Sequence, residues 1–197
     1  MKKSITGIMV MFLFAFAQEP NTQYDPNNQA RIRLFGQNGR PTIMISGIDC
    51  NVGNKGEEVN IGGSMGDAFG SLLGSAKNVS LGMPQTEATK TISEQNGMLS
   101  KAIYKEFAIP ANKPVNIRSA FIGLSNVLNG KYVTITQYEG NCKSKIISFV
   151  PQAGKDYEVI SLQRGEKCIL PTVFEIITED SQIKLKEVVT SEAVKCD

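Results

Sequence analysis

The chain of 197 residues contains no histidine and no tryptophan. The absence of histidine excludes Ser-His-Asp and Cys-His nucleophilic sites, histidine-ligated zinc and imidazole acid–base catalysis. If the protein is an enzyme, its catalytic groups must be carboxylates, lysines or serines; otherwise it does not catalyse a reaction. The absence of tryptophan disfavours a glycan-binding module, because only five Tyr and nine Phe side chains are available to stack on a sugar.

Long hydrophobic runs are also absent, apart from one at the N-terminus. Lys2 and Lys3 precede an apolar stretch, Ile5–Ala17, which ends in the small-x-small pattern Ala-Phe-Ala. This predicts a secretory signal peptide over residues 1–17, cleaved before Gln18. An uncleaved anchor is the alternative, but the stretch is shorter than the roughly 20 apolar residues that a spanning helix needs. No stable transmembrane span is therefore expected after cleavage.

The excess of positive charge belongs to the predicted signal peptide. The whole chain has 21 Lys and Arg against 19 Asp and Glu. Loss of Lys2 and Lys3 leaves equal numbers of each sign. A neutral chain without a basic stretch predicts no nucleic-acid partner and no anionic lipid partner.

Four cysteines follow the predicted cleavage point: Cys50, Cys142, Cys168 and Cys196. An even number in an exported chain indicates two disulfides, for which three connectivities are possible. We favour Cys142 with Cys168, which ties two nearby strand starts, and Cys50 with Cys196, which holds the C-terminal tail. A metal site is disfavoured because no C-x2-C pair occurs, and a catalytic thiol because no histidine can activate it.

Short hydrophobic runs alternate with turn residues along most of the remaining chain. Within residues 30–35, apolar side chains alternate with Arg31 and Arg33, the period-two pattern of a half-buried strand. An Asn-Gly pair at residues 38–39 predicts a tight hairpin turn into the next strand. The further predicted strands are Thr42–Ile48, Tyr104–Ile109, Val115–Ile122, Tyr132–Tyr138, Ser144–Val150, Tyr157–Leu162, Ile169–Thr178 and Gln182–Val189.

This spacing predicts an all-β fold, an antiparallel Greek-key (immunoglobulin-like) β-sandwich with a Gly-rich insertion, for which a helix is one alternative. Turns at Asn126–Gly130 and Glu179–Ser181 separate predicted strands. No long amphipathic helical pattern lies between the strands, which disfavours a parallel α/β sheet. We expect residues 18–29 to be a flexible lead-in and residues 30–197 a single domain, with an insertion over residues 60–98.

A Pro- and Gly-containing turn precedes the strand that Tyr157 opens. This arrangement predicts a tyrosine corner, in which the hydroxyl bonds to backbone a few residues upstream; a tyrosine filling the core edge is the alternative. Together with Phe107–Val115, the motif Phe149–Val159 resembles small exported bacterial β-sandwich proteins of undefined function. The resemblance covers Ala30–Cys50 and Phe107–Ile176, somewhat under half of the chain. The resemblance rests on residues that form turns. It therefore implies a fold and a cellular compartment, and it implies no functional site.

The Gly-rich segment Asn60–Gly82 does not fit a strand pattern. Its glycines recur every fourth residue, so on a helix they would form one smooth face to which another backbone could come close. The candidate interaction surface consists of Gly66, Phe69, Gly70, Leu72, Leu73 and Gly74. The alternative, which we favour, is a long mobile insertion or a short helix on the sandwich, because each glycine costs a helix roughly 1 kcal/mol.

No motif predicts a catalytic site, a metal or a cofactor. Ser181 and Lys184 have S-x-x-K spacing, but Ser181 falls in a predicted turn and Lys184 would face solvent. The adjacent carboxylates Glu57-Glu58 and Glu179-Asp180 point apart on a strand, which makes them poor acid–base pairs.

We therefore expect an exported, periplasmic or secreted protein of the bacterial cell envelope that is not an enzyme. It would act by binding a protein partner or by a structural role. A periplasmic immunity or inhibitor protein is one alternative. A carboxylate-based hydrolase is another, and it would need two inward-facing acids across a cleft.

Overall fold

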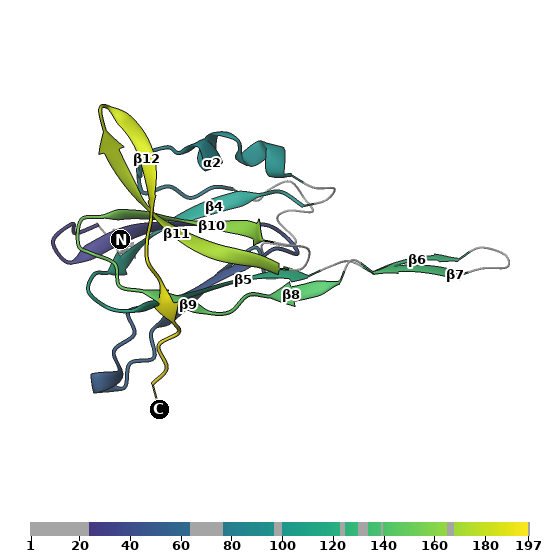
Figure 1. Ribbon diagram of the computed structural model, residues 1–197, viewed down its shortest axis with the longest axis horizontal. Helices are drawn as coiled ribbons and strands as arrows, with labels where there is room; N and C mark the ends of the chain where they lie inside the picture. The colour runs from purple at the N-terminus through teal and green to yellow at the C-terminus, as the bar shows by residue number, and fades with distance from the viewer. Residues whose placement is uncertain are drawn as a thin grey trace, which may run out of the picture.

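The computed structural model describes residues 24–63, 77–96, 100–122, 125–129, 134–138, 140–164 and 168–196. For residues 125–129, 134–138, 162–164 and 168–169 it describes the backbone only. Two β-sheets pack against each other (Figure 1), so the predicted all-β sandwich is confirmed. Within these ranges no helix is long and apolar enough to cross a membrane.

The first sheet has the strand order β12-β11-β10-β1-β4. Its strands are β12 (Gln182–Glu187), β11 (Cys168–Glu179), β10 (Asp156–Arg164), β1 (Gln29–Gly36) and β4 (Ile103–Pro110). The purely antiparallel prediction is wrong at one place, because β1 runs parallel to β10. These two strands are far apart in the sequence, and no hairpin turn connects them to fix their relative direction.

The second sheet has the order β13-β9-β5-β2-β3, and β8 pairs with the far end of β5. Its strands are β13 (Ser191–Glu192), β9 (Ile147–Phe149), β5 (Val115–Ile122), β2 (Thr42–Ser46), β3 (Glu57–Ile61) and β8 (Asn141–Lys143). A separate hairpin joins β6 (Ser125–Asn129) to β7 (Thr134–Tyr138). The turn predicted at Asn126–Gly130 is therefore wrong, because pairing with β7 extends its first residues into a strand.

The core lies between the two sheets and follows the alternation of each strand. Ile32 and Leu34 of β1 are fully buried, as are Val115 and Ile117 of β5 in the opposite sheet. Burying each such side chain contributes about 1.5–3 kcal/mol. The alternate residues of β5 therefore face outward, which places Arg118 on the outer face of the second sheet.

The Asn-Gly turn at residues 38–39 forms, but it does not make the predicted hairpin. The N–H of Arg40 donates to the Gln37 carbonyl at 2.8 Å, and Gly39 adopts a φ of 79°. However, β1 and β2 belong to different sheets, so the turn is a corner of the sandwich. At this corner, a Cβ on Gly36 would lie 2.4 Å from the Ile61 carbonyl oxygen of β3, so only glycine permits the approach.

Tyr157 opens β10 beside the turn that follows β9. Its hydroxyl accepts a hydrogen bond from the backbone N–H of Gln152 at 3.0 Å. Its ring packs edge to face against the Phe149 ring at a centroid separation of 5.1 Å. Burial raises the pKa of the hydroxyl. This is the backbone contact that a tyrosine corner requires, and it ties the turn to the core.

Residues 77–96 cross the outer face of the first sheet (Figure 1). They include the short helices α2 (Glu87–Lys90) and η2 (Ile92–Gln95). Thr86 caps α2 through a reciprocal pair of hydrogen bonds with Thr89. Val79 pairs with the backbone of β4, so this segment also covers one edge of the sheet.

Candidate functional site

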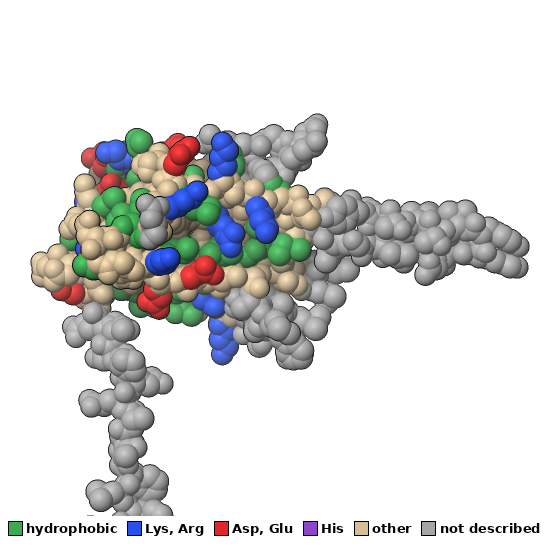
Figure 2. Space-filling model, turned by 90° about the horizontal axis from the view of Figure 1, so that it is seen from below, with side chains coloured by type: hydrophobic (Ala, Val, Ile, Leu, Met, Phe, Trp, Pro, Cys, Tyr) green, Lys and Arg blue, Asp and Glu red, His purple; other side chains and the backbone are tan. Residues whose placement is uncertain are grey.

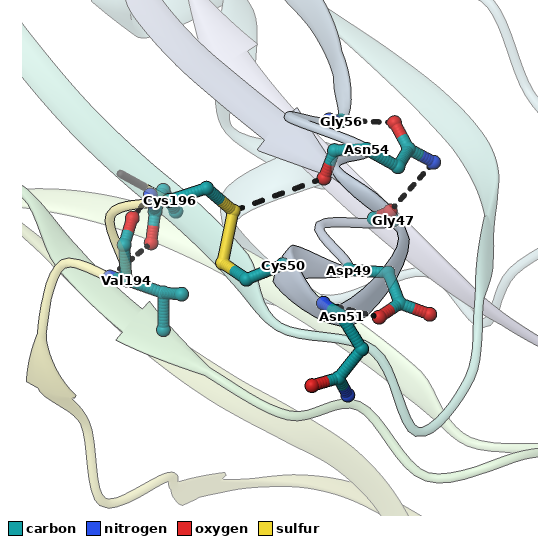
Figure 3. Close-up of a disulfide and its surroundings, with 9 residues drawn as sticks. Gly47, Asp49, Cys50, Asn51, Asn54, Gly56, Val194 and Cys196 are labelled. Carbon is teal, nitrogen blue, oxygen red and sulfur yellow. Dashed lines mark hydrogen bonds between the residues drawn. A yellow bond between two sulfur atoms is a disulfide. The ribbon is translucent and has the colours of Figure 1, made fainter.

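The C-terminal tail is fastened to the second sheet by a disulfide and a side-chain clamp. Cys50, at the start of the short helix η1 (Cys50–Val52), is bonded to Cys196 as predicted (Figure 3). The Asn116 side chain of β5 donates to the Val194 carbonyl at 2.8 Å and accepts from the Val194 N–H at 3.0 Å. These contacts make the tail part of the folded body.

The β6–β7 hairpin, which we call the arm, projects from the body (Figure 1). It leaves from β5 after Ile122 and returns to β8 at Asn141, and these two residues are register partners. Cys142 follows in β8 and is disulfide-bonded; the side chain of Cys168, its expected partner, lies outside the described residues. The base of the arm is thus held by strand pairing and by a covalent bond.

The two strands of the arm pair only with each other among the described strands. Their sequences, SNVLN and TITQY, contain no charged residue and no proline. A two-stranded ribbon has two edges whose backbone N–H and C=O groups lack a ladder partner, and charge or proline is the usual protection of such edges. The arm therefore presents backbone that another strand can join.

A cavity of about 380 Å³ lies beside the base of the arm, on the outer face of the second sheet. Arg118, Ile43 and Asn60 form one row across three strands of its floor. Figure 2 views this side of the molecule and shows Lys and Arg side chains among hydrophobic ones. A second cavity, of about 330 Å³, lies between the corner at residues 36–42 and the helices α2 and η2.

Three charged side chains lie buried in one row of the first sheet. Arg33 of β1 is the register partner of both Glu106 on β4 and Glu158 on β10. Its guanidinium donates to Glu106 Oε1 at 2.6 and 3.0 Å and to Glu158 Oε2 at 2.7 Å. The arginine side chain is 1% exposed and the two carboxylates 0%. One guanidinium therefore lies between two buried carboxyl groups in this row.

The segment that crosses the first sheet is bonded to this row. Glu106 Oε2 accepts hydrogen bonds from the Ser80 hydroxyl and from the backbone N–H groups of Leu81 and Met83. Burial raises the pKa of Glu106, but the hydrogen bonds from Arg33 and from this segment outweigh it and hold the pKa below its ordinary value. The carboxylate is therefore ionised and acts as the docking point of the segment.

Glu158 is bonded less completely than Glu106. Its Oε2 accepts from Arg33 and from the Thr86 hydroxyl, each at 2.7 Å, whereas its Oε1 is buried without a hydrogen-bond partner. Arg33 also donates to the Pro84 carbonyl at 2.9 Å. All three side chains of the row are therefore hydrogen-bonded to the segment that crosses the sheet.

This pair of carboxylates does not match the acid pair that a hydrolase would use. Glu106 has a lowered pKa, whereas a general acid needs a raised one. Neither Glu106 nor Glu158 lines either cavity described above. The geometry therefore makes the pair a structural anchor.

The other sequence-derived candidates lie apart from these features. Ser181 occupies the β11–β12 turn with a φ of 61°, and Lys184 pairs with Glu179 at 2.9 Å, so the S-x-x-K spacing forms no dyad. Glu57 and Glu58 are exposed on β3. Among the described residues, no cluster of three potential metal ligands occurs. The predicted interaction surface, Gly66, Phe69, Gly70, Leu72, Leu73 and Gly74, lies outside the described residues.

Sequence reasoning missed the arm and the buried ionic row. The pattern of β1 correctly places Arg31 and Arg33 on its polar face, but it does not show that a distant segment covers Arg33. Comparisons with protein-family models, curated proteins and solved structures find no match to this chain.

Proposed function

We propose that this chain is an exported, non-catalytic binding protein that joins a strand of a protein partner to its projecting arm. The observation that carries the proposal is a ribbon outside both sheets with two uncharged edges. Strand addition supplies affinity through main-chain hydrogen bonds and needs no deep cleft. The disulfide Cys50–Cys196 supports an exported location, because disulfides persist in oxidising compartments.

The edges of the two sheets are protected against pairing with another strand, unlike the edges of the arm. The β12 edge carries Lys184 and Lys186, and the β3 edge carries Glu57 and Glu58. The β4 edge is covered by Val79, and β13 is only two residues long. Charge, cover and shortness are the ordinary means of preventing edge-to-edge pairing. They protect the body, whereas neither strand of the arm carries a charged residue.

An immunity or inhibitor protein is the second candidate, and the projection of the arm favours it. A hairpin held away from the body by its paired base can enter a concave surface of a toxin or enzyme. The Greek-key, immunoglobulin-like description of the fold also remains our proposal, and the Tyr157 contact supports it.

An arm-deleted variant tests the function. Because Ile122 and Asn141 are register partners, an Asn-Gly pair can replace residues 123–140 as a two-residue hairpin turn. The body should keep its far-ultraviolet spectrum and melt cooperatively, because the arm lies outside both sheets.

The binding measurement compares the intact chain, the arm-deleted chain and Val127→Lys in capture from the envelope fraction, followed by binding to the purified partner. We expect both changes to abolish binding, while Ile183→Lys on β12 leaves it unchanged. Hydrogen exchange of the complex should show new amide protection in residues 125–138. Unchanged binding after deletion, or protection confined to the body, would contradict the proposal. If sedimentation shows dimers that form only when the arm is present, the partner is a second copy of this chain and not a foreign protein.

A further inference from the structure

The cavity beside the base of the arm has a floor of two residue rows. Ile43 is the register partner of both Asn60 and Arg118, and Ala120 is the partner of Lys143. Since neighbouring strands lie about 4.8 Å apart, Asn60 and Arg118 have Cα atoms about 10 Å apart with Ile43 between them. Side chains from these two positions can therefore reach one small ligand above Ile43.

Two polar groups of this floor have unused hydrogen-bonding capacity. The Arg118 guanidinium, which is half-buried, has no hydrogen-bond or ion-pair partner in the part of the chain that the structure describes. The Asn60 Oδ1 atom is buried without a hydrogen-bond partner. Most buried polar groups in proteins are paired, so the unpaired Asn60 Oδ1 atom in the same cavity as the half-buried Arg118 points to a ligand.

The lining determines the chemistry of that ligand. Its charged members are Arg118 and Lys143, and among the residues that the structure describes no Asp or Glu lines the cavity. Its apolar lining includes Ile43 of the floor together with Phe121 and Ile122, and Ile122 is 55% exposed. An anion with an apolar body complements cations beside an apolar wall.

We propose that this cavity binds a carboxylate attached to an apolar body of about the size of one amino-acid residue. The Arg118 fork donates two N–H groups to the carboxylate. The Asn60 amide bonds the polar group next to the carboxylate, and the apolar body covers Ile43 and Ile122. A free apolar acid and the C-terminal residue of a peptide share this chemistry. The proposal goes beyond strand addition and does not depend on it.

Isothermal titration of the intact chain with N-acetyl-leucine tests the proposal. N-acetyl-leucinamide, which lacks the charge, should bind at least about tenfold more weakly, since a hydrogen bond to a charged group contributes about 1.5–3 kcal/mol. Acetate, which lacks the apolar body, should also bind more weakly. N-acetyl-Ala-Ala-Leu distinguishes the sources: tighter binding than N-acetyl-leucine indicates a peptide C-terminus, and weaker binding a free acid.

Arg118→Gln should lower the affinity for N-acetyl-leucine about 10- to 100-fold. Lys145→Gln removes an exposed cation outside the cavity lining and should leave the affinity unchanged. Far-ultraviolet spectra establish that both variants are folded. The proposal is overturned if the acid and the amide bind equally, if Arg118→Gln binds like the unaltered chain, or if none of the compounds binds at millimolar concentration. None of these measurements uses the arm-deleted chain. Failure of the partner-binding assay would therefore leave the test of this cavity unaffected.

Discussion

Replacing Arg33 with methionine removes the cation that links two buried carboxylates. Glu106 keeps the hydrogen bonds to its Oε2 atom from the covering segment, but its Oε1 loses both donors from Arg33. Glu158 keeps only the Thr86 hydroxyl. The variant therefore buries two carboxylates with no positive charge between them.

The expected cost at neutral pH is about 3–5 kcal/mol, because removal of one partner leaves uncompensated charge in the interior. This is a large part of the about 5–15 kcal/mol that stabilises an ordinary domain. Burial without Arg33 should raise the pKa of the Glu106 carboxyl in the folded variant. A raised folded-state pKa favours folding below the unfolded-state value and loses that contribution as pH rises through the folded-state value. The cost should therefore shrink from pH 7.5 to pH 5.

Urea denaturation at both pH values measures this effect, with Arg31→Met as a matched control on the same strand. Arg31 also forms a two-bonded ion pair, with Asp156 at 2.7 and 2.8 Å, but its side chain is 19% exposed. Because solvent still reaches this pair and can screen the charge left on Asp156, we expect the control to lose less stability than Arg33→Met. If Arg33→Met matched Arg31→Met and showed the same pH dependence, the assignment of Arg33 as the central anchor would be wrong.

Three further predictions concern the stability of the body. The lowered pKa of Glu106 stabilises the fold above the unfolded-state pKa of about 4.3, and this contribution is lost as pH falls through the folded-state value. Between pH 7 and pH 3 the urea midpoint of Glu106→Gln should therefore fall less than that of the unaltered chain. Gly36→Ala should cost at least about 1–3 kcal/mol by thermal melting, because its methyl group would enter backbone of β3. Gly53→Ala should cost less, because its methyl group meets open space and adds only the strain of a left-handed φ of 69°. Cys50→Ala with Cys196→Ala should cost about 2–5 kcal/mol in urea, since the bond closes a loop with a sequence separation of 146.

Local pattern predicted those features of the fold that depend on local sequence. The strand β5 has the bounds Val115–Ile122 that alternation predicted, because side chains facing the core recur every second residue. The Cys50–Cys196 bond also follows the expected pairing. The first prediction requires only the periodicity of one strand, and the second requires only that the C-terminal tail returns to the folded body.

Features that depend on distant segments were not predictable in this way. Alternation gives Arg31 and Arg33 the same face, yet residues 80–86 cover Arg33 almost completely. The β6 strand begins in a segment whose Asn and Gly content favours a turn, and it forms through pairing with β7. Pairing overrides propensity there, since strand preference depends strongly on neighbouring strands.

Site-specific photocrosslinking in the envelope tests the binding account most directly. A photoreactive residue at Val127, in the arm, should give one covalent adduct with a partner protein, and a residue at Ile183, on the charged β12 edge, should give none. Peptide mapping of the adduct should locate the crosslink in an extended segment of the partner. Adducts from Ile183 but not from Val127 would contradict the claim that the arm is the binding edge.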